Sequence, residues 1–206
     1  MVWQNENWLA VDKPADWLTV PSRQGTDDMR PCLGRELERR LGLRLWPVHR
    51  LDFEVSGLVL FALSAEAHRR ANRWFEDHLV VKTYGALSLG PVAAQFMQEN
   101  EWKCKLVRGK RRAFVAEHGQ PSLTMAQCLG PDGDFWRWKL QPKTGRSHQL
   151  RVEMYRHGYS ILGDELYGGQ VWDQPGIALR AENLNFAAVA NEQRLQLPAQ
   201  LSLAKE

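Results

Sequence analysis

One carboxylate of the sequence is placed where it could do chemistry. Asp52 stands two residues after Arg50 in the stretch VHRLDFEVSGLVLF, just before an apolar run that begins at Gly57. An aspartate acts as a nucleophile or a general base only while it is ionised. Burial raises the pKa of a carboxyl group, and a nearby guanidinium lowers it again. Asp52 is therefore a candidate catalytic residue, and an arginine is the partner to look for.

The stretch QPKTGRSHQLRVEM supplies such an arginine. Arg146 follows a turn that contains Pro142 and Gly145, and it opens a predicted helix, so its side chain starts from a rigid place. A pair between Arg146 and Asp52 would be charge-assisted and could be bidentate. A purely structural ion pair would need the same two residues, so they do not establish catalysis by themselves.

The remaining candidates are a tyrosine and the histidines. Tyr84 lies in a predicted strand and offers a flat ring for stacking and a hydroxyl for proton transfer. A core position is the commoner role for a tyrosine, and His49 and His148 could simply orient the backbone or their neighbours. The six histidines are scattered, with no HExxH motif and no three-ligand cluster, so we expect no catalytic metal.

Residues 102–114, WKCKLVRGKRRAF, hold six basic side chains within ten positions. Repulsion between neighbouring like charges predicts a mobile loop or an exposed hairpin. A solvated charge run is one interpretation. Contact with nucleic acid is favoured by the scarcity of nearby acids and by the flanking aromatic residues Trp102 and Phe114, since bases stack on such rings. Phosphate contacts there would carry affinity and salt dependence, not sequence choice.

The elements that must position these residues follow from the apolar pattern. We predict strands at 7–13, 57–64, 80–90, 134–142, 183–189 and 195–203, and helices at 30–42, 65–79 and 146–158. In the strand at 134–142, Trp136, Trp138 and Leu140 alternate with Arg137 and Lys139, so we expect the two sets on opposite faces. Strands outnumber helices and do not alternate with them regularly. This favours an α+β fold around a mixed or antiparallel sheet.

Two helices carry recognisable end signals. In the first, Pro31 suits the first helical position, Leu33, Leu37 and Leu41 form an apolar face, and Gly42 suits the C-terminal cap. In the second, Ser64 can cap the N-terminus. The apolar face of that helix is formed by Ala67, Ala71, Trp74, Phe75 and Leu79.

Composition excludes several classes of protein. The chain has 206 residues, 44% of them apolar, which suits one domain with a real core. A net charge of +3 permits an anionic partner without requiring one. Cys32, Cys104 and Cys128 form no CxxC pair, so neither a disulfide framework nor a zinc site is indicated. No stretch reaches the length of a membrane span, and we expect a cytoplasmic protein.

Four sequence blocks, in order, resemble the motifs of RluA-type pseudouridine synthases. They are ENWLAVDKPADWLTVPS, HRLDFEVSGLVLFALS, VVKTYGAL and QPKTGRSHQLRVEMYRHGYSILGDELYGG, which together span most of residues 6–169. LRAENLNF resembles the family's late strand, with Arg180 in place of histidine. Other departures are Asp16 where glycine is common, Phe53-Glu54-Val55 in place of Lys/Arg-Asp-Thr, and Glu153 in place of histidine.

The resemblance implies a reaction and a role for each matching residue. The family isomerises uridine in RNA to pseudouridine: the N1–C1′ bond breaks, the uracil turns, and C5 joins the ribose. Asp52 would attack C1′ or remove the 2′ proton, and the sequence leaves both routes open. Tyr84 would stack on the flipped uracil and help take the C5 proton, and Arg146 would pair with Asp52. The residues expected to bind the substrate are Arg50, Leu150, His49, Lys143, Lys110, Arg111 and Arg112.

The resemblance also implies the architecture and the partners. We expect a single pseudouridine synthase catalytic domain over residues 1–206 without an S4 domain, and a bipartite central sheet flanked by helices. We expect a monomer that needs no cofactor or metal. The expected substrate is large-subunit (23S) ribosomal RNA, with tRNA as the alternative.

Two other classes stay open at this stage. One is an RNA chaperone on the same fold. The other is a nuclease or glycosidase that uses Asp52, which would normally need a second carboxylate or a metal cluster close by. Glu54 is the nearest candidate for that second carboxylate.

Overall fold

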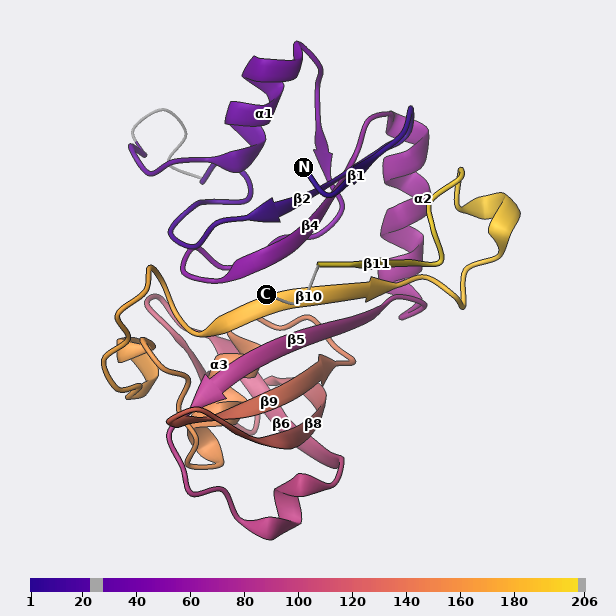
Figure 1. The fold of residues 1–206 in the computed structure, drawn as a ribbon. Helices are drawn as coiled ribbons and strands as arrows, with labels where there is room; N and C mark the ends of the chain where they lie inside the picture. Colours follow the sequence, from indigo (N-terminus) through magenta and orange to yellow (C-terminus); the bar gives the residue numbers. More distant parts are fainter. Residues whose placement is uncertain (23–27, 204–206) are drawn as a thin grey trace. The chain divides into compact units, whose positions relative to one another are not determined.

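The structure, a computed structural model, describes residues 1–22 and 28–203, and the chain divides into two compact units (Figure 1). The first unit comprises Met1–Val80 and Ala181–Glu206, and the second comprises Val81–Arg180. Strands and helices occur in both units, and the pairs β1–β2, β2–β4, β5–β9 and β8–β9 are antiparallel. The predicted α+β class is confirmed.

The sheet of the first unit is built on β2 (Trp8–Lys13) and β4 (Ser56–Ala62). Strand β4 also pairs with β3 (Trp46–Pro47), and β2 with β1 (Trp3–Gln4). Residues 57–62 of β4 are all buried, as the continuous apolar run predicts for a strand covered on both faces.

Two further strands complete the first unit. Strand β10 (Leu179–Asn185), most of which lies in this unit, pairs with β11 (Gln200–Ser202). The strand predicted at 183–189 therefore begins and ends four residues earlier than expected, and the strand predicted at 195–203 is reduced to Gln200–Ser202. The turn between them includes the 3₁₀ helix η4 (Asn191–Gln193).

Helix α2 (Ala65–Glu76) packs on the sheet of the first unit as the sequence predicts. The Ser64 hydroxyl accepts a hydrogen bond from the backbone N–H of Ala67 at 3.1 Å, so Ser64 is the N-cap. Ala67, Ala71 and Trp74 form the buried face. The Trp74 ring lies 5.5 Å from that of Trp8 on β2, centroid to centroid.

Helix α1 (Leu33–Leu41) begins later than predicted. The backbone N–H of Leu18 donates to the Pro31 carbonyl, and that of Leu33 donates to the Leu18 carbonyl, each at 2.8 Å. These bonds hold the chain extended up to Cys32, so Pro31 lies outside the helix. Leu41 is 37% exposed, so the predicted apolar face is also incomplete. Gly42 caps the end in the left-handed conformation, as predicted.

The sheet of the second unit has the strand order β5-β9-β8-β6-β7. The strands are β5 (Val81–Ser88), β6 (Asn100–Arg108), β7 (Ala113–Val115), β8 (Gln120–Asp132) and β9 (Phe135–Pro142). In β9, Trp138 and Leu140 are fully buried while Arg137 and Lys139 are not, which confirms the predicted alternation. Short 3₁₀ helices, η2 (Ala94–Met97) and η3 (Glu165–Tyr167), lie in the connections.

The basic run forms a hairpin, one of the two structures predicted for it. Leu106 on β6 pairs with Val115 on β7, and the Gly109 N–H donates to the Arg112 carbonyl at 3.0 Å across the tip. The expectation that Trp102 offers a stacking surface is wrong. The alternation of β6 turns Trp102 inward, where it is 3% exposed and stacks on the His157 ring at 4.1 Å. Phe114 is 44% exposed.

Helix α3 (Gln149–Arg156) is shorter than the predicted 146–158. His148 adopts φ 50° and ψ 22°, a left-handed conformation that cannot continue into a right-handed helix, so α3 begins one residue later. Arg146 consequently lies in the loop before the helix and does not open it.

Three absences hold for residues 1–22 and 28–203. No helix there is long and apolar enough to cross a membrane. The three cysteines are free. No group of three or more metal-ligating side chains is present.

Candidate active site

Asp52 lies on the loop between β3 and β4 in the first unit, and its neighbours are held through the backbone. The Thr19 hydroxyl donates to the Leu51 carbonyl and accepts from the Leu51 N–H, each at 3.1 Å. The Val55 N–H donates to the Asp52 carbonyl at 3.2 Å and closes a turn. Leu51 and Val55 are buried. The loop therefore holds the backbone of Asp52 in one position.

Lys13 is the central support of this loop. Its side chain is fully buried, and its amine donates to the carbonyls of Pro14, Trp17 and Phe53 at 2.9, 2.7 and 3.1 Å. Burial lowers the pKa of Lys13 from 10.5 to about 8, although the charges of nearby acids, Asp52 among them, oppose the shift.

Sequence reasoning did not single out Lys13. The only signal in the sequence was its place in the Lys-Pro pair of the first block. The role itself depends on contacts with two separate loops, and the spacing of residues does not show such contacts.

Glycine is required where the Asp52 loop enters β4. Gly57 has φ +114°, and a Cβ added there would stand 2.3 Å from the Ala181 carbonyl oxygen of β10. A second backbone restriction accounts for one departure from the family pattern. Asp16 has φ 57°, a conformation open to glycine and tolerated by aspartate.

His49 and Arg50 precede Asp52 in different environments. The Leu60 N–H donates to Nε2 of His49 at 3.2 Å, and the His49 ring stacks on Phe75 with centroids 5.4 Å apart. His49 therefore orients the start of the loop, the structural role weighed for it above. The side chain of Arg50 is exposed at the surface of the loop.

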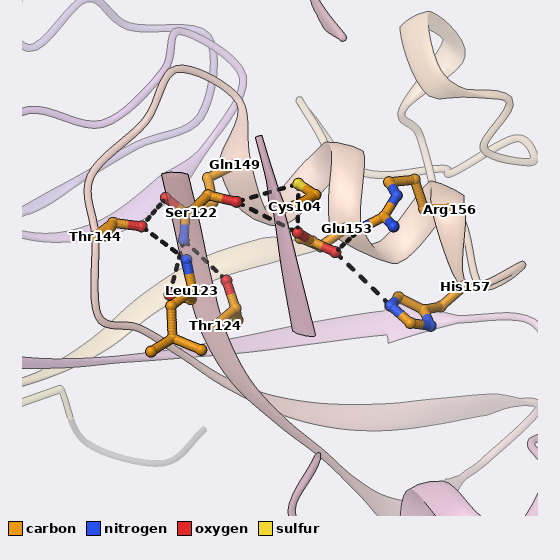
Figure 2. A network of polar contacts seen from close by, with 9 residues as sticks. All are labelled: Cys104, Ser122, Leu123, Thr124, Thr144, Gln149, Glu153, Arg156 and His157. Atoms are coloured by element: carbon orange, nitrogen blue, oxygen red, sulfur yellow. Dashed lines mark hydrogen bonds and ion pairs between the residues drawn. The ribbon is translucent and has the colours of Figure 1, made fainter. Parts of the chain in front are cut away.

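In the second unit, Gln149 organises the loop that carries Arg146. Its Oε1 accepts from the Thr144 hydroxyl at 2.7 Å and from the Arg146 N–H at 3.0 Å, and its Nε2 donates to the Leu123 carbonyl at 3.0 Å and to the Thr124 hydroxyl at 2.9 Å. Figure 2 shows Gln149 with Leu123, Thr124 and Thr144 around it. The loop is thereby fixed to β8. The sequence analysis missed this role, although Gln149 belongs to the GRSHQLR block.

The guanidinium of Arg146 is held at the start of β8. Its Nε donates to the Pro121 carbonyl at 3.0 Å, and its Nη1 donates to Oε1 of Gln120 at 2.6 Å. Asp52 belongs to the other unit, so the pairing of Arg146 with Asp52 stays a prediction.

Tyr84 and Leu150, the residues expected at the base, also lie in the second unit. Tyr84 stands opposite Leu140 in the β5–β9 pair, and Leu150 is a buried residue of α3. Beside Tyr84 on the same strand, Lys82 donates to the Thr144 carbonyl at 3.2 Å, and burial lowers its pKa to about 8. Lys143, in the loop before α3, has an exposed side chain.

Tyr167 joins the basic hairpin to the segment around α3. Its hydroxyl donates to the Ala113 carbonyl of β7 at 2.9 Å and lies 3.1 Å from Nδ1 of His148. Burial raises the pKa of Tyr167 to about 12, so the hydroxyl keeps its proton. The guanidinium of Arg112, at the hairpin tip, donates to the Leu166 carbonyl at 3.2 Å. Lys110 and Arg111 are exposed.

Two buried acids stabilise the same unit. Arg151 donates through Nε and Nη2 to both oxygens of Asp164 at 2.7 and 2.8 Å, and the two side chains are only 2% and 1% exposed. Glu153 of α3, seen in Figure 2, accepts from Cys104 of β6 at 2.9 Å and from Arg156 at 2.8 Å. Glu153, which stands where the family often has histidine, thus ties the hairpin strand to α3.

Comparison with known proteins decides the family. The family model described as RNA pseudouridylate synthase matches residues 7–155. The chain belongs to the RluA-type pseudouridine synthases. It is 32% identical over 203 residues to the dual-specificity RNA pseudouridine synthase RluA of Pasteurella multocida, covering 97% of this chain and 91% of that protein. It is 27% identical over 221 residues to tRNA pseudouridine synthase C of Vibrio vulnificus, covering 98% and 90%.

The fold agrees with this RluA-type assignment. The structure of human RNA Pseudouridylate Synthase Domain Containing 1 matches with a TM-score of 0.74 at 25% identity, covering 99% of this chain and 82% of that one. The predicted pseudouridine synthase fold is therefore confirmed. The protein is an RNA pseudouridine synthase, an isomerase whose substrate is RNA.

Proposed function

We propose that this RluA-type enzyme isomerises specific uridines of structured RNA with Asp52 as the essential catalytic residue. The observation that carries the proposal is the double clamp on the Asp52 loop by Thr19 and Lys13. A carboxylate that must reach one atom of a ribose needs a fixed backbone, because small errors of position are costly in rate. Asp52 would attack C1′ or remove the 2′ proton, and both routes release the uracil.

The other roles rest on the match to the family blocks and on rigid local structure. Tyr84, on a paired strand, would stack on the flipped uracil and help take the proton from C5. Arg146, on the loop fixed by Gln149, would pair with Asp52, and Leu150 would contact the base from the other side. Arg50 would help to open the RNA stack. A uracil inside a helix or stacked loop must leave the stack to be reached, and apolar and aromatic walls would keep it from water.

We propose large-subunit ribosomal RNA as the substrate, with tRNA as the second candidate. The second candidate is supported by relatives whose names specify dual specificity and tRNA. In the second unit, the exposed hairpin carrying Lys110, Arg111 and Arg112 supports binding to either RNA, since phosphate contacts are independent of sequence.

The test is release of tritium from RNA labelled with 5-³H-uridine, because C5 loses its proton only if isomerisation occurs. Unmodified ribosomal RNA and unmodified bulk tRNA are each incubated with wild type, with Asp52→Asn and with Asp77→Asn, a control at an exposed position that ends α2. We expect release from at least one RNA by wild type and by Asp77→Asn, and none by Asp52→Asn.

The outcomes separate the alternatives. Release that persists in Asp52→Asn contradicts the assignment of Asp52. Tight binding of both RNAs without release by wild type favours the RNA chaperone. Strand cleavage or free uracil in place of pseudouridine favours the nuclease or glycosidase.

A further inference from the structure

A second arginine of the first unit, Arg30, is held next to the Asp52 loop. Its guanidinium carbon lies 5.2 Å from the centroid of the Phe53 ring, and Phe53 directly follows Asp52. Its Nε and Nη2 donate to the two carboxylate oxygens of Asp28 at 2.9 and 2.7 Å. The side chain is still 47% exposed, so it is oriented without being buried.

Both supports of this arrangement are rigid. The chain after Arg30 is fixed by the hydrogen bond from Leu18 to the Pro31 carbonyl, and the Phe53 carbonyl is fixed by Lys13. The Asp28 side chain is only 6% exposed, but Arg30 is open to solvent, and an ion pair that water can screen adds little to stability, typically less than about 1 kcal/mol. The pair instead orients Arg30: its guanidinium lies over the Phe53 ring, and Asp28 accepts hydrogen bonds from its Nε and Nη2.

Several acidic side chains lie around the Asp52 loop, and a cation beside the loop would help RNA to approach. Glu54 lies close enough to raise the pKa of Arg30, a shift caused mainly by the hydrogen bond with Asp28, and Asp16, Asp52 and Glu54 all act on Lys13. Such a group of acids repels RNA. Lys13 is fully buried and donates to three carbonyls, so it cannot meet a phosphate. An exposed arginine beside the loop can.

We propose that Arg30 binds a backbone phosphate of a nucleotide that flanks the target uridine. A guanidinium is planar, always charged, and matched to phosphate oxygens by the geometry of its N–H groups. The position of the guanidinium over the Phe53 ring places its exposed N–H groups next to the loop that carries Asp52, where RNA must approach. The inference rests on the proposed function of Asp52 and adds a substrate contact to it.

The experiment compares Arg30→Gln with Arg39→Gln. Arg39 is an exposed arginine of the same unit, paired with Glu36 on α1, and serves as the matched control. RNA affinity is measured against salt concentration, and kcat/KM is measured by tritium release, both with full-length protein. For Arg30→Gln we expect a roughly 10-fold lower kcat/KM and a salt slope smaller by about 0.7 to 0.9, the value for one lost phosphate contact. Arg30→Lys should recover the slope.

A neutral methylphosphonate sharpens the test once the target uridine is mapped. Placed at the contacted phosphate, it should abolish the difference between wild type and Arg30→Gln. The proposal is overturned if Arg30→Gln matches Arg39→Gln in slope and kcat/KM while wild type releases tritium, a result that leaves the proposed function intact. A lower kcat/KM with an unchanged slope also overturns the phosphate assignment. If wild type releases no tritium but Arg30→Gln still lowers the slope, the proposed function fails and the phosphate contact stands.

Discussion

The Asp52 loop and the tip of the basic hairpin are held in opposite ways. The loop is fixed on both sides of Asp52 by a buried lysine and a buried threonine that bond to its backbone. The hairpin tip is closed by one backbone bond from Gly109 to the Arg112 carbonyl, and its basic side chains are exposed. One region fixes a single functional group, whereas the other presents several interchangeable charges.

The difference fits the roles proposed for the two regions. A reacting carboxylate is effective only at one position, so its backbone must resist displacement. Phosphate contacts are nearly additive and tolerate adjustment, so a binding arm gains from charge more than from rigidity. Substitutions in the loop should therefore affect folding and rate together, and substitutions of Lys110 and Arg111 at the tip should affect binding alone.

The largest effect is expected from Lys13→Met. The substitution removes the donor of three carbonyls, and buried acceptors left without partners are costly. We expect the free energy of unfolding in urea to fall by about 3 kcal/mol. We also expect tritium release to fall by more than the unfolded fraction explains, because the Phe53 carbonyl loses its hydrogen bond and the backbone next to Asp52 is no longer fixed. Lys103→Met, at an exposed lysine paired with Glu101, is the control and should change stability by less than about 0.5 kcal/mol. Equal losses in the two variants would contradict the role of Lys13.

An intermediate effect, confined to binding, is expected from neutralising Lys110, Arg111 and Arg112 together. Three lost phosphate contacts should lower the salt slope of RNA binding by about 2 and weaken affinity roughly uniformly across RNA sequences. The rate of tritium release at saturating RNA should stay near that of wild type. An unchanged salt slope would show that the tip does not contact RNA.

The smallest effect is a pH dependence at the base of the hairpin. Burial raises the pKa of Cys104 from 9.0 to about 11, and the hydrogen bond to Glu153 adds to the shift. Between pH 9 and about 11 the thiol of the unfolded chain loses its proton while the thiol of the folded chain keeps it. The stability that this group contributes is therefore complete below pH 9 and is lost as the pH rises toward 11. Urea unfolding of wild type and Cys104→Ser from pH 8 to 11 should show a steeper decline for wild type. Parallel curves would contradict this prediction.

Features set by neighbouring residues were predicted correctly from the sequence. Helix α2 with its Ser64 cap and the alternation of β9 depend on periodicity and on local hydrogen bonds, and the hairpin is one of the two structures predicted for residues 102–114. The four blocks placed the chain in its family for a related reason, since each block is read along a continuous stretch of sequence.

Tertiary structure decided the features that depend on distant partners. The start of α1 depends on bonds to Leu18, and the inward position of Trp102 depends on which face of β6 is covered. Lys13 bonds to backbone carbonyls of two separate loops, and Gln149 joins the loop before α3 to strand β8. The contact of Arg30 with Phe53 joins residues 23 positions apart in the sequence. The sequence by itself determined which chemical groups the candidate site offers and most of the elements that carry them. Only the folded chain determined which of those groups are held in place, because side-chain type and spacing do not encode contacts between segments far apart in the sequence.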